Sequence, residues 1–261
     1  MRYFDFLDLA TPADQLTLEL IGSDWGNSVE NKVDCDLLFL ITAHAGDLDI
    51  AKKNAKLIRK LISVNKFLNV DVKILVGDLS QSTAFFHKDE IIYLNCSDYY
   101  EGLPEKVLSG MNAIFNSFDF KWVLKIDAGM TPNDMNGLID LVKLNFDETS
   151  PRGYGFIREK RFEIDRAWHK GKCHDQELNL QDATENFPRM WLDGGRGYLL
   201  NQNAVFLIIK ELFESAPRYN YRNAIYEDVL LGMIAEDLIP LGNADFSKFF
   251  YDATNPLNLR R

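Results

Sequence analysis

The sequence predicts an α/β fold in which helices flank a mainly parallel sheet. Several short segments are apolar throughout, as expected of strands buried on both faces. Segments between them carry apolar residues three or four positions apart, as in helices that pack on a sheet. The 261 residues are 46% hydrophobic and 26% charged. This composition is typical of a globular chain and excludes disordered, collagen-like and coiled-coil classes.

The first half of the predicted domain alternates strands with a helix. Residues 37–41 (LLFLI) are the first predicted strand. After Asp47 the apolar residues take helical spacing, namely Leu48, Ala51, Ala55, Ile58 and Ile62. Residues 70–76 (VDVKILV) and 90–94 (EIIYL) are the next two predicted strands.

A second helix and a fourth strand complete the repeating pattern. Pro104 stands in the first turn of a helix whose apolar face carries Leu103, Val107, Met111, Ile114 and Phe118. Residues 122–126 (WVLKI) are the fourth strand. Short right-handed connections place the loops after all four strands at one edge of the sheet, where open α/β sheets bind ligands.

The remaining segments are less regular. Residues 145–190 are rich in charged and aromatic residues and are predicted to form a long loop region, and helical spacing returns at 204–213 and 226–234. We therefore expect an N-terminal segment over 1–34, whose structure the pattern leaves open, and one domain over 35–261.

Charge, cysteine content and hydropathy limit the partners. The net charge of −10 argues against nucleic acid as a partner. Cys35, Cys96 and Cys173 lack CxxC spacing, which argues against a disulfide scaffold and favours a reducing compartment. There is no signal-peptide pattern and no apolar window long enough to span a membrane. We therefore predict a cytoplasmic location, with peripheral membrane association left open.

Three segments place ligand-binding residue types at the end of a strand or helix. Asp127 follows the fourth strand, where it can bind a sugar hydroxyl or a metal; alternatively it caps the next helix. Residues 193–197 (DGGRG) allow close approach of the backbone to a ligand, or else form a bulge or turn. Arg196 in this segment can bind a phosphate. Residues 226–232 (YEDVLLG) open a helix with two acids, which stabilise its positive end and are candidates for a general base.

Taken in order, these segments resemble the motifs of the GT-A-fold β-1,3-glycosyltransferases, the galactosyltransferase and Fringe-related family. Members of this family carry DxYxNLTxK, KxDDD, GGGYxLS and EDVxxG. The corresponding segments here are 98–106 (DYYEGLPEK), 125–129 (KIDAG), 195–201 (GRGYLLN) and 227–232 (EDVLLG). The resemblance runs from about residue 36 to residue 240 and implies a single domain of the nucleotide-diphospho-sugar transferase type.

The resemblance implies an inverting hexosyltransferase. It would move a sugar from a UDP-sugar donor to a saccharide hydroxyl, forming a β-1,3 linkage in surface polysaccharide or glycoconjugate synthesis. Asp228 would be the catalytic base, and Asp127 would contact the ribose or sugar of the donor. The donor side would also include Lys125, Arg196, Gly195, Gly197 and Asp78. The acceptor side would include Trp191, Asp193 and Glu227.

The segment that corresponds to KxDDD departs from the family pattern. Its second and third acids fall on Ala128 and Gly129, and no histidine follows Asp228 to complete a metal site. We therefore predict a donor site without protein-held Mn²⁺ or Mg²⁺. In one explanation a basic side chain neutralises the diphosphate instead, and the candidates are Arg158, Lys160, Arg189 and Arg196. The alternative is a noncatalytic nucleotide- or carbohydrate-binding module on a transferase scaffold.

Overall fold

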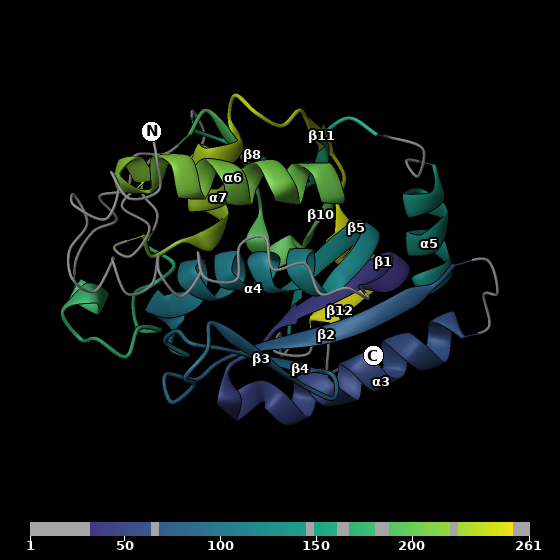
Figure 1. The fold of residues 1–261 in the computed structure, drawn as a ribbon, viewed down its shortest axis with the longest axis horizontal. Helices are drawn as coiled ribbons and strands as arrows, with labels where there is room; N and C mark the ends of the chain where they lie inside the picture. Colours follow the sequence, from purple (N-terminus) through teal and green to yellow (C-terminus); the bar gives the residue numbers. More distant parts are fainter. Residues whose placement is uncertain are drawn as a thin grey trace.

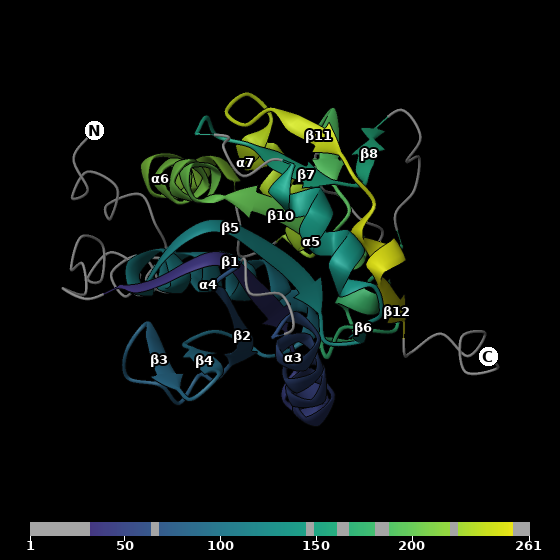
Figure 2. The same cartoon turned by 90° about the vertical axis from the view of Figure 1, so that its right-hand side faces the viewer.

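An eight-stranded mixed sheet lies at the centre of the fold, with helices on both of its faces (Figures 1 and 2). This is a computed structural model that describes residues 32–63, 68–144, 149–160, 167–180, 188–219 and 224–252. The strands of the sheet are β1 (Val33–Thr42), β2 (Val70–Gly77), β3 (Phe85–Lys88), β4 (Ile91–Leu94), β5 (Phe118–Asp127), β7 (Gly153–Gly155), β10 (Tyr198–Asn201) and β11 (Leu241–Asn243). Their order is β11-β7-β10-β5-β1-β2-β4-β3.

Two small sheets and a set of helices surround this sheet. The small sheets pair β6 (Met130–Pro132) with β12 (Phe250–Asp252), and β8 (Ile157–Glu159) with β9 (Met190–Leu192). The α-helices are α3 (Leu48–Ile62), α4 (Leu103–Ser117), α5 (Met135–Lys143), α6 (Gln202–Tyr219) and α7 (Glu227–Ala235). The 3₁₀ helices are η1 (Ala45–Asp47), η2 (Tyr100–Gly102), η4 (Leu178–Leu180), η5 (Gly194–Arg196) and η6 (Phe246–Phe249). Most of the predicted N-terminal segment lies outside the described residues.

The four central strands run parallel. β1 pairs in parallel with β2 and with β5, and β2 pairs in parallel with β4. Thr42, the last residue of β1, lies opposite Leu75 of β2 and Asp127 of β5. The carboxyl ends of these strands therefore meet at one edge of the sheet, as predicted. β3 and β10 are antiparallel to their neighbours, so the outer parts of the sheet are mixed.

Both faces of the sheet are covered, which explains why β1 is apolar over its whole buried length. Leu38 and Leu40 belong to the hydrophobic cluster that includes residues of α4, α6 and α7. Leu37, Phe39 and Ile41 belong to the cluster on the opposite face, with residues of α3 and α5. All five side chains are completely buried. Within the described ranges, no helix is long and apolar enough to cross a bilayer.

The structure confirms the predicted strands and helices and extends most of them. Phe118 begins β5 instead of ending the preceding helix. The predicted loop region 145–190 contains β7 and β8, which at three residues each are too short to give a periodic pattern. Asp134 caps α5 by accepting the Gly137 N–H, so the alternative in which Asp127 caps this helix is wrong. The edge strand β3 was not predicted.

Two isoleucines on α3 provide a matched test of this packing. Ile58 is completely buried, whereas Ile50 is 41% exposed. We expect Ile58→Ala to lower the free energy of unfolding by about 2–5 kcal/mol, because it leaves a cavity between α3 and the sheet. Ile50→Ala should cost less than about 1 kcal/mol. Chemical denaturation of both variants checks this, and equal costs would contradict the packing described here.

Candidate functional site

A pocket of about 540 Å³ opens at the edge of the sheet where β1, β4 and β5 end. Its described lining comes from four parts of the chain: Thr42, Ala43, His44 and Asp47 at and after the end of β1; Asp98, Tyr99, Tyr100, Leu103 and Lys106 after β4; Asp127, Ala128 and Gly129 at and after the end of β5; and Lys172, Cys173 and His174. A pocket at this edge agrees with the ligand position expected for an open α/β sheet.

Asp98 holds the strand ends that frame the pocket. Its Oδ1 atom accepts hydrogen bonds from Lys106 Nζ at 2.6 Å and from the Gly77 N–H at 2.8 Å. Its Oδ2 atom accepts the Ala45 N–H at 2.6 Å. Lys106 is 3% exposed and also donates to the Ala43 carbonyl at 3.0 Å. The pair thus joins the ends of β1 and β2 to the first turn of α4. Asp98 was not among the predicted site residues, although it opens the first motif segment.

Aromatic and basic side chains form one wall of the pocket. The rings of Tyr99 and His174 are stacked, with centroids 4.0 Å apart, and the His44 ring lies 6.5 Å from Tyr99. The Lys172 Nζ atom lies 5.3 Å from the centre of the Tyr100 ring. No periodic pattern predicts these contacts, because His174 and Lys172 belong to the irregular region 145–190. Aromatic faces of this kind can stack on a nucleobase or a sugar ring.

The backbone of residues 173–175 is fixed against the start of α4. The His174 and Asp175 N–H groups both donate to the carboxylate of Glu101 at 3.1 Å. On the other side, His169 Nδ1 lies 2.6 Å from the Tyr226 hydroxyl, directly before α7. The segment that carries Lys172 and His174 is therefore bound both to η2, directly before α4, and to the residue before α7.

Asp127 connects the pocket to a buried cluster of charges. Its side chain is 43% exposed, and its Oδ1 atom lies 2.7 Å from Lys125 Nζ and 3.1 Å from Thr42 Oγ1. Lys125 itself is 1% exposed. Its ammonium group also lies 2.9 Å from Glu227 Oε1 and 3.3 Å from the Gly194 carbonyl. Lys125 therefore joins the end of β5 to η5 and to the first turn of α7.

The cluster contains one cation and three carboxylates. Burial by itself lowers the pKa of Lys125, but the charges of Asp127 and Glu227 outweigh it and raise the pKa well above its usual value. Burial raises the pKa of Glu227 to about 7, with a further contribution from Asp228, while Lys125 opposes the rise. The chemical consequence is a lysine that stays charged beside a glutamate that exchanges a proton near neutral pH.

Asp228, the second acid of α7, contacts η5 and does not line the pocket. Its Oδ2 atom accepts the Gly194 N–H at 3.1 Å, its Oδ1 atom accepts the Val229 N–H at 2.9 Å, and the residue is 3% exposed. The described lining of the pocket includes Asp127 but neither Asp228 nor residues 195–197. The structure thus brings the three predicted elements together through hydrogen bonds, but only Asp127 faces the pocket.

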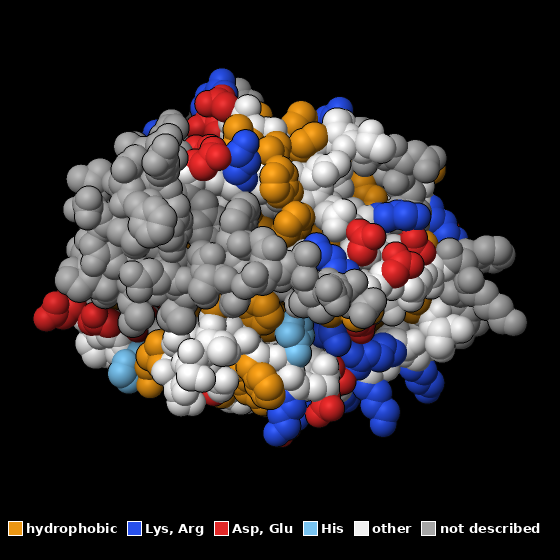
Figure 3. Space-filling view, in the orientation of Figure 1, with side chains coloured by type: hydrophobic (Ala, Val, Ile, Leu, Met, Phe, Trp, Pro, Cys, Tyr) orange, Lys and Arg blue, Asp and Glu red, His pale blue; other side chains and the backbone are white. Residues whose placement is uncertain are grey.

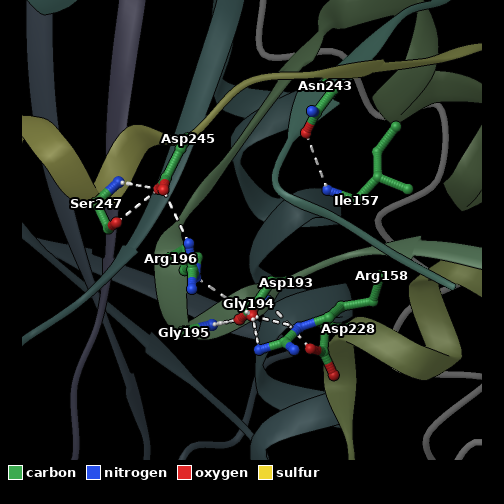
Figure 4. A network of polar contacts seen from close by, with 10 residues as sticks. All are labelled: Ile157, Arg158, Asp193, Gly194, Gly195, Arg196, Asp228, Asn243, Asp245 and Ser247. Carbon is green, nitrogen blue, oxygen red and sulfur yellow. Dashed lines mark hydrogen bonds and ion pairs between the residues drawn. The ribbon is translucent and has the colours of Figure 1, made fainter. Parts of the chain in front are cut away.

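The predicted arginines are bound to carboxylates instead of lining the pocket (Figure 4). Arg158 contacts Asp193 Oδ2 through Nε and Nη2, both at 2.8 Å. Arg196 lies 3.8 Å from the same oxygen and binds Asp245 at 2.8 Å. Asp193 also accepts the Gly195 N–H at 3.0 Å. This network holds η5 in place and leaves Asp193, at 3% exposed, little access to a ligand.

Three other predicted residues have structural contacts. Trp191, predicted on the acceptor side, is completely buried and packs against residues at the start of α7, so its ring is closed off from an acceptor in this conformation. Gly197 has a φ of +77°, and a Cβ atom there would lie 3.0 Å from the Lys125 carbonyl. The Asp78 carboxylate accepts hydrogen bonds from Ser80 and Gln81 within its own turn and is not part of the described pocket lining.

Comparison with known families decides the assignment. The family model described as Galactosyltransferase matches residues 68–239, which is more than half of the chain. The chain belongs to the galactosyltransferase family. It is therefore a glycosyltransferase with an α/β fold built on a largely parallel sheet, and the resemblance deduced from the motifs is confirmed.

Other comparisons add less. No curated protein sequence matches this galactosyltransferase-family chain. One solved structure that matches is described as "crystal structure of a glycosyltransferase involved in the glycosylation of the major capsid of PBCV-1". It is 12% identical, the match covers 80% of this chain and 82% of that chain, and the TM-score is 0.38. The family assignment therefore rests on the family model.

The donor set does not fit a metal ion held by the protein. No group of three His, Cys, Asp or Glu side chains among the described residues could hold one. Asp98, an acid of the pocket lining, has both carboxylate oxygens occupied by backbone N–H donors and Lys106. We therefore assign no step of the reaction to a metal bound by these residues.

The buried ion pairs of Lys125 are expected to be important for stability. Lys125→Met should lower the free energy of unfolding by about 3–5 kcal/mol, because it leaves buried carboxylates without a cation. Lys121→Met on the same strand should cost at most about 1 kcal/mol, since its pair with Asp36 is exposed. Glu227→Gln should raise the stability of the Lys125→Met variant by more than it raises that of the wild type. Denaturation of the four variants tests this, and simple additivity would contradict it.

Glu227 should also make stability depend on pH. Its carboxyl has a usual pKa of 4.5 and a pKa of about 7 in the folded protein, so the folded chain binds the extra proton between these values. The free energy of unfolding of the wild type, relative to Glu227→Gln, should therefore fall as pH rises from about 5 to about 7.5.

The partly exposed acid Glu236 is the control for this pH dependence. Arg189 lowers the pKa of Glu236, so Glu236→Gln should show no such fall over the same interval. Urea denaturation at several pH values measures both differences. A wild-type advantage over Glu227→Gln that stays constant or grows with pH would show that Glu227 is not the group that holds the proton.

Proposed function

We propose that this enzyme transfers a hexose from a UDP-sugar to a hydroxyl of a saccharide acceptor. The observation that carries the proposal is the position of Asp127, which lines the pocket and is bound through Lys125 to Glu227 at the start of α7. A carboxylate at this point can accept hydrogen bonds from the ribose or sugar hydroxyls of a donor. The pocket volume is within the range of about 300–1,000 Å³ that is usual for small-molecule sites.

The wall of the pocket suits a nucleoside diphosphate. Tyr99 is 46% exposed and stacked on His174, so this pair offers a planar surface for a base. The charges of a diphosphate require cations, and the predicted arginines are bound to Asp193, Asp245 and Glu236. We therefore assign this role to Lys172, with His44 and His174 as hydrogen-bonding groups that line the same pocket.

The proposed reaction is a single displacement with inversion. The acceptor oxygen attacks the anomeric carbon, the bond from this carbon to the diphosphate oxygen breaks, and UDP leaves with the bonding electrons. Asp228 takes the proton of the acceptor hydroxyl, in accordance with its place in the Glu-Asp-Val motif. Glu227 is the rival base, because its pKa of about 7 suits proton transfer near neutral pH. The acceptor would reach either acid past Gly195, the exposed residue of η5.

The finer details of the reaction follow the family pattern. We propose a β-1,3 linkage and a role in surface polysaccharide or glycoconjugate synthesis, in the cytoplasm. The proposed metal independence is supported by Lys172 in the pocket wall and by Ala128 and Gly129 at the positions of the second and third acids of the family motif. A panel of UDP-sugars measured by thermal shift would identify the donor, since a ligand that binds only the folded state raises the Tm.

Two single substitutions distinguish the candidate bases. Asp228→Asn should reduce transfer at least about 100-fold, the usual contribution of a general base, and should leave UDP binding unchanged. Glu227→Gln should keep most of the transfer activity if Asp228 is the base. The measurements are product formation from a UDP-sugar and titration calorimetry with UDP. Full turnover by Asp228→Asn would remove Asp228 from this role.

The same calorimetry tests the alternative of a noncatalytic binding module. UDP should bind equally with Mn²⁺ and with EDTA, and Asp127→Asn should weaken binding of the donor sugar more than binding of UDP. Donor hydrolysis or transfer should accompany binding. Binding without turnover under every condition would favour the module, and binding that requires Mn²⁺ would contradict the proposed metal independence.

A further inference from the structure

A row of four lysines follows the exposed face of α3. Lys52, Lys56 and Lys60 are spaced four residues apart, Lys53 lies beside them, and all four are exposed. Basic side chains gather over α3 at the lower right of Figure 3, and Figure 1 places this helix along the lower margin of the molecule. We name these four residues the α3 lysine row.

The row belongs to a stretch whose charge differs from that of the rest of the chain. Residues 50–69 contain six basic residues and no acid, although the whole chain has 39 acids among 261 residues. The remainder of the chain therefore carries a net charge of −16. This separation gives the molecule one basic helix on an otherwise acidic body.

The spacing of the row is unfavourable for the helix itself. Like charges four residues apart lie next to each other on a helix and destabilise it. Asp49 in the first turn is the one acid of α3, so acids do not alternate with the lysines. The acidic remainder already gives the chain a net charge sufficient for solubility. An external anionic partner would explain why the lysines are concentrated here.

We infer that the α3 lysine row docks on an anionic phospholipid surface. A flat membrane can contact one ridge while the acidic body faces away from it, whereas a long polyanion would extend over the acidic surface and be repelled. The inner face of α3 packs on the sheet through Ala51, Ala55 and Ile58. This packing keeps the lysines on the outer face of the helix, toward solvent. Ile50, which is 41% exposed, adds an apolar contact at the start of the row.

Docking by this helix would place the pocket near the membrane. α3 begins at Leu48, immediately after Asp47, which lines the pocket. An acceptor saccharide linked to a membrane lipid would then be presented on the side of the pocket formed by the β1 loop. The inference concerns the surface alone and does not depend on the identity of the sugar donor.

Vesicle binding of the full chain tests the inference. The chain should co-sediment with vesicles of mixed phosphatidylglycerol and phosphatidylcholine but not with pure phosphatidylcholine, and added salt should weaken binding. Lys56→Gln with Lys60→Gln should weaken it about 25-fold, at about fivefold for each lysine. The double variant should have a Tm at least as high as the wild type, because it removes a like-charge pair.

A second double variant is the matched control. Lys121→Gln with Lys210→Gln removes two exposed lysines from β5 and α6 and should leave vesicle binding within about twofold of the wild type. Equal loss in both double variants, binding to neutral vesicles, or no vesicle binding would overturn the inference. Tighter binding to single-stranded DNA than to the anionic vesicles would also overturn it in favour of a soluble polyanion. Transfer to a soluble acceptor is measured separately and should be the same for all variants.

Discussion

A single buried ammonium group, that of Lys125, determines how the site is arranged. Removing a lysine from water is costly unless carboxylates and carbonyls surround it. Asp127, Glu227 and the Gly194 carbonyl meet this requirement from three different parts of the chain. The end of β5, the η5 turn and the start of α7 must therefore adopt one mutual arrangement. Burial in this cluster, together with the charges of Asp228 and Asp127, raises the pKa of Glu227 to about 7.

Asp98 and Lys106 apply the same principle on the other side of the pocket. Lys106 is almost completely buried and stays paired with Asp98, whose oxygens also bind the backbone at the ends of β1 and β2. Together the two lysines join the carboxyl ends of the central strands to the helices that follow. The ion pairs of Lys106 and Lys125 therefore hold the strand ends around the pocket in place. Tyr99 and His174 form the exposed wall of the pocket.

The basic side chains that stabilise the fold differ from those that line the pocket or the outer surface. Arg158 and Arg196 share Asp193 and thereby fix η5. The basic groups that line the pocket are contributed instead by the β1 loop and by residues 172–174. The α3 lysine row lies apart from both networks, on a helix that packs against the opposite face of the sheet from α7. Structural arginines, pocket cations and an outer basic surface thus occupy different places on one acidic chain.

The sequence by itself determined the central α/β pattern, because strands buried on both faces and amphipathic helices leave strong local signals, as at 37–41 and 48–62. It also placed Asp127, Glu227 and Asp228 at the ends of regular elements, which the structure confirms. Only the tertiary structure decided that Trp191 is core, that Arg196 is bound to Asp245, and that Asp98, His44 and His174 share one pocket. The physical reason is that burial and ion pairing depend on contacts between residues far apart in the chain, which no local pattern records.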